Sequence, residues 1–450
     1  MRENEKVKVS VIIYVKNSVN YMEQCVRSVM SQTLGEIEIL IVDGGSTDGT
    51  LVLIEKLKQE DGRIRLFHGA ASVGAQFNLG LREAKGDYIG VCEADDYLLP
   101  DMYERQYKTA EENQLDVIRA GYYQVFEIGG QEYRFKLNAC GADIPTEKVI
   151  QGDDGMLFLG QGINGFWNGL YKRQFLLDHQ IWMNETKGAA YQDISFSFFT
   201  QMYARRVWFM DEAFYCYRID NPDASANSLH GVRFHMEEYE ILKMRLEKAR
   251  LWEAYKNMFF SWELVSYQWF LHQLPQNQRV ADATAVYRQL LSQYEESAYQ
   301  IGHVIEKVQK LAEKLISGKE EFLSEILAGT KENEKLLDYM TNSFPSERQV
   351  ILFGMGHIGT MVCSFLEKYK KEVFFTDNSP HLQKHGIKGK RVYSPKQLTE
   401  SMLEGRYIVT NAGHSQEMKE QLMKMGVPDE RILICSDEAF FLRKIFVKEW

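Results

Sequence analysis

Acidic residues follow two apolar runs in the first hundred positions of this 450-residue chain. Asp43 ends the run that begins at Ile37, and Glu93 and Asp95 follow the run that begins at Tyr88. Burial makes charge expensive, so carboxylates at the ends of buried strands need a partner. In open parallel sheets ligands bind at the carboxyl ends of the strands, which makes these acids candidate ligand groups.

Glu93 and Asp95 are two positions apart, so an extended chain would direct both carboxylates to the same side. Two carboxylates on one side suit a hard divalent cation, which could also hold a diphosphate. After Asp43 the sequence GGSTDGT offers flexible glycines and backbone N–H groups, Gly45 and Ser46 among them, before a helix start. The alternative is that these residues only cap turns, because Gly, Ser and Asp clusters are ordinary turn chemistry.

The elements that must position these acids alternate between strand and helix. The predicted strands are Val9–Val15, Ile37–Val42, Ile64–Phe67 and Asp87–Cys92, and a helix is expected around Gln76–Ala84. Unbroken apolar strands that alternate with helices are typical of a parallel sheet covered on both faces.

These segments together resemble the N-terminal half of a family 2 glycosyltransferase, which has the GT-A fold. The resemblance is carried by VSVIIYVKNS, EILIVDGGSTDGT and NLGLREAKGDYIGVCEADDYLLPDM, which lie between Val9 and Met102. It implies a Rossmann-like mixed sheet and a nucleoside diphosphate sugar as donor, usually UDP-linked. It also implies that Asp43 reads the base, with Gly45 and Ser46 beside it.

The same resemblance assigns the rest of the donor site. Asp95 belongs to an Asp-x-Asp motif that holds Mn²⁺ or Mg²⁺ on the diphosphate, with Glu93 at the first position of that motif. Asn78 and Arg82 lie near the donor.

The segments FWNGLYKRQFL, from Phe166, and YQDISFSFF, from Tyr191, resemble the acceptor-side half of the family. There Asp193 occupies the place of the catalytic base, which would take the proton of an acceptor hydroxyl so that direct attack inverts the anomeric centre. The acceptor would be a saccharide or a lipid-linked molecule. A hydrolase with two carboxylates is conceivable, but an exposed diphosphate site makes an activated donor the simpler interpretation.

Three positions depart from the family pattern. Tyr14 stands where the family usually has Pro, Glu93 where it often has Asp, and Gln192 where it has the first acid of a pair. Gln192 removes a negative neighbour of Asp193, which would tend to lower the pKa of Asp193 and make it a weaker base.

Trp167 and Asn168 lie in a glycine-rich stretch before the predicted acceptor side. An aromatic ring can stack on the apolar face of a sugar while an amide binds its hydroxyls, so both are candidate acceptor-binding residues. Large aromatic side chains also dominate protein cores, and packing alone would explain Trp167 about as well.

The rest of the chain predicts two further domains after a glycosyltransferase domain at residues 1–230. Residues 231–346 are rich in apolar residues at helical spacing and predict a helical segment. Residues 347–450 predict a small Rossmann-like α/β domain, in which Gly354, Gly356 and Gly359 follow a strand and Asp377 ends the next one. Three interpretations remain for this motif: a retired nucleotide fold that packs or pairs subunits, a nucleotide sensor, or a second enzyme.

Composition excludes several classes of function. The net charge of −10 argues against a nucleic-acid-binding protein. The six cysteines are far apart, which favours reduced thiols in a cytoplasmic protein. No run approaches the roughly 20 apolar residues of a membrane span.

The resemblance implies a role in bacterial surface-polysaccharide or glycolipid synthesis, at the inner face of the membrane. The aromatic helix expected at Met258–Leu274 could touch that membrane, although its apolar residues occur nearly all round, which favours burial. A homo-oligomer through the C-terminal domain also stays open. The rival functions are a non-catalytic nucleotide-sugar-binding or scaffold protein and an NAD-linked enzyme centred on the C-terminal domain.

Overall fold

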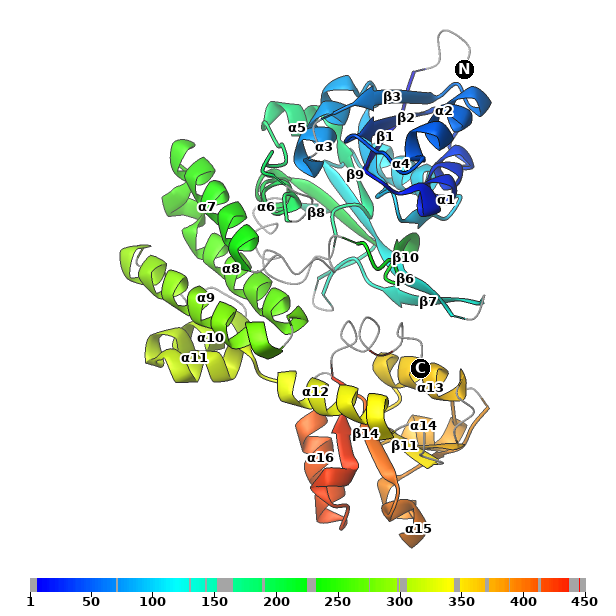
Figure 1. Cartoon of the computed structure of the whole chain (residues 1–450), viewed down its shortest axis with the longest axis vertical. Helices are drawn as coiled ribbons and strands as arrows, with labels where there is room; N and C mark the ends of the chain where they lie inside the picture. The colour runs from blue at the N-terminus through cyan, green and yellow to red at the C-terminus, as the bar shows by residue number, and fades with distance from the viewer. Residues whose placement is uncertain are drawn as a thin grey trace. The chain divides into compact units, whose positions relative to one another are not determined.

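The computed structural model (Figure 1) describes residues 6–69, 72–128, 131–141, 144–151, 165–187, 191–224, 232–274, 276–297, 299, 306–343, 349–368, 372–387, 389–411, 414–436 and 445. The chain divides into two compact units, Met1–Phe126 with Glu132–Ile326, and Leu327–Trp450 with Glu127–Gln131. The helices up to Ile326 therefore belong to the same unit as the N-terminal sheet. The predicted boundaries at 230 and 346 stay predictions.

A mixed sheet forms the core of the first unit, in the order β3-β2-β1-β4-β9-β6-β10-β5, with β7 beside β6 and β8 beside β10. The pairs β2–β3, β1–β2 and β1–β4 are parallel, whereas β9 runs antiparallel to both β4 and β6. The predicted mixed α/β fold is therefore confirmed. Its strands are β1 (Val9–Val15), β2 (Ile37–Asp43), β3 (Ile64–His68), β4 (Tyr88–Val91), β5 (Tyr97–Leu98), β6 (Val117–Ile128), β7 (Gln131–Leu137), β8 (Ile150–Gln151), β9 (Gly169–Lys172) and β10 (Arg206–Arg218).

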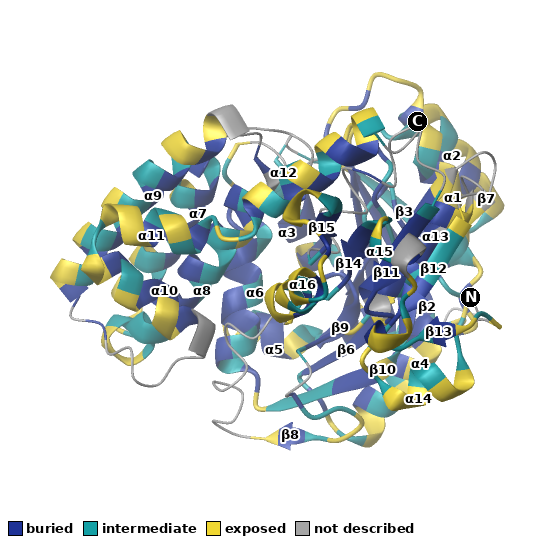
Figure 2. Ribbon diagram, turned by 90° about the horizontal axis from the view of Figure 1, so that it is seen from below, coloured by how far each residue is buried: buried dark blue, intermediate teal, exposed yellow. Residues whose placement is uncertain are grey.

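The apolar composition of these strands explains their place in the core. Every residue of β1 and β2 is buried, as expected for strands with helices on both faces, and Figure 2 shows the buried colour running along the sheet. The helices of this unit are α1 (Val19–Met30), α2 (Thr50–Glu60), α3 (Val73–Glu83), α4 (Met102–Glu112), α5 (Arg173–Asp178), α6 (Asp193–Tyr203), α7 (Val232–Lys248), α8 (Trp252–Gln273), α9 (Gln276–Ser297), α10 (Glu306–Ser317) and α11 (Lys319–Ile326).

Helix α8 contains the aromatic stretch for which the sequence left membrane contact open. Phe259, Phe260, Leu264 and Tyr267 are buried, whereas Trp269 is 43% exposed. Most of the apolar surface of this helix is therefore used inside the first unit. None of the described helices has both the length and the apolar character that crossing a membrane requires.

The second unit contains a five-stranded parallel sheet in the order β13-β12-β11-β14-β15. The predicted Rossmann-like arrangement is confirmed as a separate parallel sheet with helices. Its elements are α12 (Thr330–Asp338), β11 (Gln349–Phe353), α13 (His357–Lys368), β12 (Glu372–Thr376), α14 (Pro380–His385), β13 (Val392–Tyr393), α15 (Glu400–Leu403), β14 (Arg406–Val409), α16 (Ser415–Lys424) and β15 (Ile432–Ile434).

Candidate active site

The carboxyl ends of β1, β2 and β4 meet at one edge of the first sheet. Val15, the last residue of β1, pairs with Asp43, the last residue of β2. On the other side of β1, the backbone N–H of Cys92 donates to the carbonyl of Ile12, 3.1 Å away. The strand ends that carry Asp43 and Glu93 are thus neighbours of the same central strand, as the parallel arrangement predicts.

Asp43 closes the loop that follows β2. Its carboxylate accepts the backbone N–H of Gly45 (2.8 Å) and of Ser46 (3.1 and 3.2 Å), and only 1% of the residue is exposed. The Ser46 hydroxyl accepts the N–H of Asn17, and Gly45 has a positive φ of 89° that favours glycine. Asp43, Gly45 and Ser46 therefore form one turn, and the alternative of turn capping describes their observed contacts. Their donor-binding role stays a prediction.

Glu93 and Asp95 do not continue β4 as an extended chain. The N–H of Asp96 donates to the carbonyl of Glu93 (3.0 Å), so the backbone turns between them. The extended backbone predicted for Glu93–Asp95 is therefore wrong, because the strand already ends at Val91. Glu93 and Asp95 nevertheless remain partly exposed, whereas Asp96 is buried. Both are available to a ligand.

Residues at and after the end of β10 hold the acidic turn in place. Asn221 donates to Asp95 Oδ2 (2.7 Å), and Arg218 donates through Nε to the carbonyl of Asp95 (3.1 Å). The Arg218 N–H and the Tyr215 hydroxyl donate to the two oxygens of Asp96, both at 2.7 Å. Asp96 is therefore a structural member of the turn, and Asp95 keeps one carboxylate oxygen toward which no described residue donates.

Asp193 is the first residue of α6 and belongs to the same electrostatic environment. Burial raises the pKa of Asp193 from its usual value. Burial first, and then the charges of Asp95 and Asp193, raise the pKa of Glu93 to about 8, although the hydroxyl of Tyr14 lowers it. Of the three acids that the sequence singled out for metal binding and catalysis, Asp95 and Asp193 thus lie near enough to Glu93 for their charges to act on it. Loss of hydration outweighs the pKa decrease that Gln192 led us to expect for Asp193.

The donor set at this edge fits a divalent cation. Among the described residues no group of three or more His, Cys, Asp and Glu side chains could hold a metal ion. Mg²⁺, however, usually uses one or two carboxylates and takes its other ligands from phosphates and water. Asp95 and Glu93 are oxygen donors and partly exposed, so they meet this smaller requirement once Glu93 has lost the proton that its raised pKa favours.

Tyr14 is a member of the site that the sequence noted only as a departure from the family pattern. Its hydroxyl donates to Glu93 Oε1 (2.6 Å), and the two residues are 79 positions apart in the chain. Two of the three departures therefore contact each other. The signal in the sequence was the pair of unusual residues at two neighbouring strand ends.

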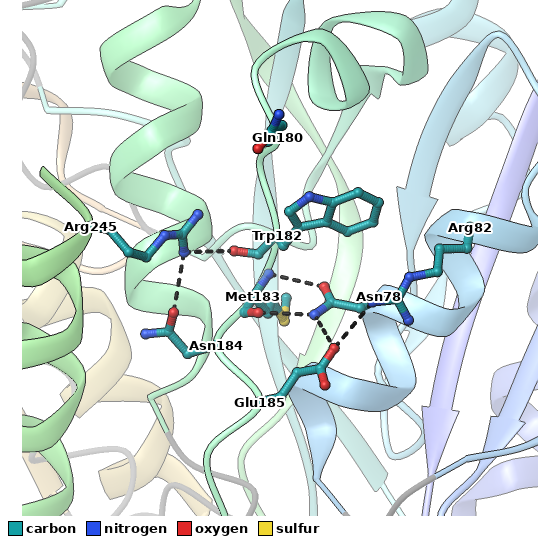
Figure 3. A pocket seen from close by; sticks show the side chains of 8 residues that line it. All are labelled: Asn78, Arg82, Gln180, Trp182, Met183, Asn184, Glu185 and Arg245. Atoms are coloured by element: carbon teal, nitrogen blue, oxygen red, sulfur yellow. Dashed lines mark hydrogen bonds and ion pairs between the residues drawn. The ribbon is translucent and has the colours of Figure 1, made fainter. Parts of the chain in front are cut away.

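Asn78 and Arg82, on α3, lie on a separate pocket of about 420 Å³ (Figure 3). The Asn78 amide donates to the Met183 carbonyl (3.0 Å) and to Glu185 Oε1 (2.9 Å), and accepts the N–H of Met183 (3.0 Å). Arg82 pairs with Glu185 at 3.4 Å and its guanidinium lies 5.4 Å from the Trp182 ring centroid. These contacts hold the chain that leads toward α6, and the donor contact predicted for Asn78 and Arg82 stays a prediction.

Trp167 and Asn168 lie in the core. The Trp167 ring stacks on Tyr215 and Tyr217, with centroids 4.2 and 5.1 Å away, and the residue is 7% exposed. Asn168 is fully buried, accepts from Arg119 Nε (3.0 Å) and donates to the Ala120 carbonyl (2.7 Å). Burial therefore favours the packing alternative for Trp167, and the Asn168 amide is hydrogen-bonded to β6; the acceptor contact predicted for both residues stays a prediction.

The glycine motif of the second unit has contacts of its own. A Cβ on Gly359 would lie 2.0 Å from the Gly354 carbonyl, and Gly354 has a φ of 101°, so packing and the turn require both glycines. A Cβ on Gly356 would meet nothing within 4 Å. Asp377 accepts the N–H of Met355 and of Ser379, each at 2.7 Å. The Asp377 carboxylate therefore stabilises the loops that contain Met355 and Ser379, and its role toward a nucleotide stays a prediction.

Comparison with known protein families gives two matches. Residues 10–178 match the family described as Glycosyl transferase family 2, and residues 346–433 match the family described as C2185-like, N-terminal. A putative glycosyltransferase of Bacillus subtilis, EpsH, is 31% identical over 218 residues, which are 48% of this chain and 62% of the relative. GlyG, a glycosyltransferase of Streptococcus pneumoniae, is 34% identical over 31% of this chain and 46% of its own length. The chain thus spans less than two thirds of these curated relatives.

Solved structures match over a longer part of the chain. TarS of Staphylococcus aureus is similar with a TM-score of 0.51 at 18% identity, over 71% of this chain and 55% of that protein. Residues 1–349 of TarS in complex with UDP-GlcNAc give a TM-score of 0.51 at 17% identity, over 72% of this chain and 92% of that chain. At this identity the likeness concerns the fold, and it extends beyond the residues that the family match covers.

Proposed function

We propose that this protein, whose residues 10–178 match the family described as Glycosyl transferase family 2, is an inverting, metal-dependent hexosyltransferase. It would move a sugar from a nucleoside diphosphate sugar to a hydroxyl acceptor. The observation that carries the proposal is that Glu93 and Asp95 follow β4 at the edge where β1, β2 and β4 end, where the charges of Asp95 and Asp193 both act on Glu93. UDP is the proposed nucleotide, in line with the family resemblance and with the UDP-GlcNAc complex of TarS, which has a similar fold.

In the proposed reaction Asp193 takes the proton from the acceptor hydroxyl. The oxygen forms a bond to the anomeric carbon while the bond from that carbon to the diphosphate breaks, and the nucleoside diphosphate leaves. A raised pKa makes Asp193 a better proton acceptor than an exposed aspartate, provided that it is ionised. Mn²⁺ or Mg²⁺, held by Asp95 and Glu93, would offset the charge that develops on the diphosphate.

The setting is also a proposal. The family resemblance favours synthesis of a bacterial surface polysaccharide or glycolipid, in the cytoplasm at the inner face of the membrane, with a saccharide or lipid-linked acceptor. The rival proposal is a nucleotide-sugar-binding or scaffold protein without turnover, and both proposals predict that UDP binds.

Turnover distinguishes the two. We would incubate the full chain with a panel of UDP-, GDP- and TDP-sugars and Mn²⁺, and measure release of the nucleoside diphosphate. Asp193→Asn should reduce the rate by about 10²- to 10⁴-fold, because it removes the base and keeps the side-chain shape. UDP binding should be unchanged, and Asp178→Asn, an exposed aspartate on α5, is the matched control. Binding of UDP without release from any donor would favour the scaffold.

A further inference from the structure

The segment Met183–Thr186 leads toward α6, the helix that begins with Asp193. It contacts α6 itself and two further helices. It contains Asn184, which is buried, and it lies against α3, α6 and α7. Figure 3 shows Met183, Asn184 and Glu185 beside Asn78 of α3 on one side and Arg245 of α7 on the other.

Helix α3 approaches this segment so closely that a side chain would not fit. A Cβ on Gly74 would lie 1.8 Å from the carbonyl oxygen of Asn184, well inside van der Waals contact. Four residues later, Asn78 both donates to and accepts from the backbone of Met183. The backbone of the segment is therefore fixed directly against α3.

Helix α7 holds the same segment through two charged side chains. Glu238 accepts from Asn184 Nδ2 (2.6 Å) and from the hydroxyl of Thr186. Arg245 donates to the carbonyl of Trp182 (3.1 Å) and to Asn184 Oδ1 (3.2 Å). Glu238 is only 2% exposed, so its loss would leave an N–H of the buried Asn184 amide and the hydroxyl of the partly buried Thr186 without this acceptor.

Asn184 connects the Met183–Thr186 segment to α6. Its Nδ2 also donates to Ser195 Oγ, 2.8 Å away and two residues after Asp193. The charge of Asp193 also acts on Glu238: burial first, with a smaller contribution from Asp193, raises the pKa of Glu238 to about 7, although the hydrogen bonds from Thr186 and Asn184 lower it. The end of α6 that bears Asp193 is thus joined to α7 by contact and by charge.

Gln192, immediately before Asp193, also binds this segment and links it to α3. Its Nε2 donates to the Thr186 carbonyl (2.6 Å) and its Oε1 accepts the N–H of Gly74 (2.7 Å), with 1% of the residue exposed. This site needs one donor and one acceptor on the same side chain. An ionised carboxylate only accepts, so a glutamate here would leave the Thr186 carbonyl without its donor.

We propose that Gln192 and Glu238 are positioning residues for Asp193. They hold the Met183–Thr186 segment against α3. In this way they fix the position of the Asp193 carboxylate relative to Glu93 and Asp95. Helix α7 would therefore contribute to the transfer reaction although it lies outside the residues that match the family. This proposal rests on the proposed glycosyltransferase activity of the same site.

The test uses the full chain and the donor that the wild type turns over. Glu238→Ala and Gln192→Glu should lower kcat by about 10- to 100-fold, as expected for a base displaced by an ångström or less. The Kd for UDP with Mn²⁺ should stay within about twofold, because both variants leave Asp43, Glu93 and Asp95 unchanged. Glu238→Gln should recover most of kcat, since its amide can accept from Asn184 and donate to the Thr186 hydroxyl.

Glu237→Ala is the matched control, because Glu237 is exposed on the same helix and should leave kcat unchanged. Folded Glu238→Ala and Gln192→Glu proteins with wild-type kcat would overturn the positioning role. Equal losses of kcat and of UDP affinity would overturn it too, because they indicate general damage to the unit. A wild type that turns over no donor contradicts the proposed function instead, so the two failures are distinguishable.

Discussion

Glu263 lies at the centre of the helical part of the first unit, and its burial makes a quantitative prediction. The residue is fully buried on α8, where Oε1 accepts from the hydroxyl of Tyr267 (3.1 Å) and from Gln289 Nε2 (3.3 Å). Oε2 has no hydrogen-bond partner among the described residues, and neither has Oε1 of Gln293, whose side chain interacts with Glu263. A proton on Glu263 would supply the donor that both buried oxygens lack.

Burial raises the pKa of Glu263 from 4.5 to about 8, against the smaller opposing effects of Tyr267, Gln293 and Lys243. The folded state therefore binds this proton more tightly than the unfolded state does. Its contribution to stability is fully present below about pH 4.5 and is lost as the pH rises toward about 8. At about 1.4 kcal/mol per pKa unit, the loss amounts to at most about 5 kcal/mol.

Glu263→Gln keeps the shape and the acceptor of this side chain but cannot ionise. We expect the variant and the wild type to have similar free energies of unfolding at pH 5, and the variant to be more stable by about 2–5 kcal/mol at pH 9. Urea unfolding followed by tryptophan fluorescence measures this, since six of the seven tryptophans lie in the first unit.

Glu253→Gln is the control, because the Glu253 side chain on the same helix is 80% exposed and should give a difference that does not vary with pH. Parallel pH curves for the wild type and Glu263→Gln would refute the reasoning, since they would mean that Glu263 is ionised and compensated in the folded protein.

Three further predictions concern the candidate active site and the segment beside it. UDP with Mn²⁺ should raise the free energy of unfolding by about 2.7 kcal/mol at a UDP concentration of 100 times its Kd. Chelation with EDTA, or Asp95→Asn, should remove this stabilisation, and stabilisation by UDP that persists in EDTA would contradict the metal assignment. Tyr14→Phe should destabilise the first unit by about 1–3 kcal/mol, because Glu93 loses its hydrogen-bond donor. A double-mutant cycle with Glu93→Gln, measured by urea unfolding, tests this contact, and additive effects would argue against it. Gly74→Ala should cost about 1–3 kcal/mol despite the helix preference of alanine, because its Cβ meets Asn184; an unchanged melting temperature would show that the segment can move away.

The first four strands of the parallel part of the sheet were predictable because most of their residues are apolar. The predicted segment Val9–Val15 is β1 to the residue, and the predicted Ile37–Val42 differs from β2 by one position. The helix after the third strand begins at Val73, three residues before the predicted Gln76, because Ser72 caps it by accepting the N–H of Ala75. Periodicity locates elements well and their ends less well.

The contacts of the site residues were not predictable in the same way. Nothing in the neighbourhood of Asn168 in the sequence indicates that Arg119 and Ala120 of β6 take up its amide. The spacing of Glu93 and Asp95 indicated a shared face only for an extended backbone, and the turn that replaces it is held by Asn221, more than a hundred residues away. Such contacts depend on which elements the fold brings together.

The departures from the family pattern acquire a different meaning once their contacts are known. Read singly, Glu93 and Gln192 weaken the case for catalysis and give the scaffold alternative its support. In the structure, the longer Glu93 side chain has its donor in Tyr14, the other departure at a neighbouring strand end, and Gln192 satisfies a donor and an acceptor that a carboxylate could not. If the protein had lost its activity and selection no longer acted on the site, such replacements would lack matching partners. Each replacement has a matching partner, which argues for an active site adjusted as a unit and against a binding fold whose chemistry has decayed.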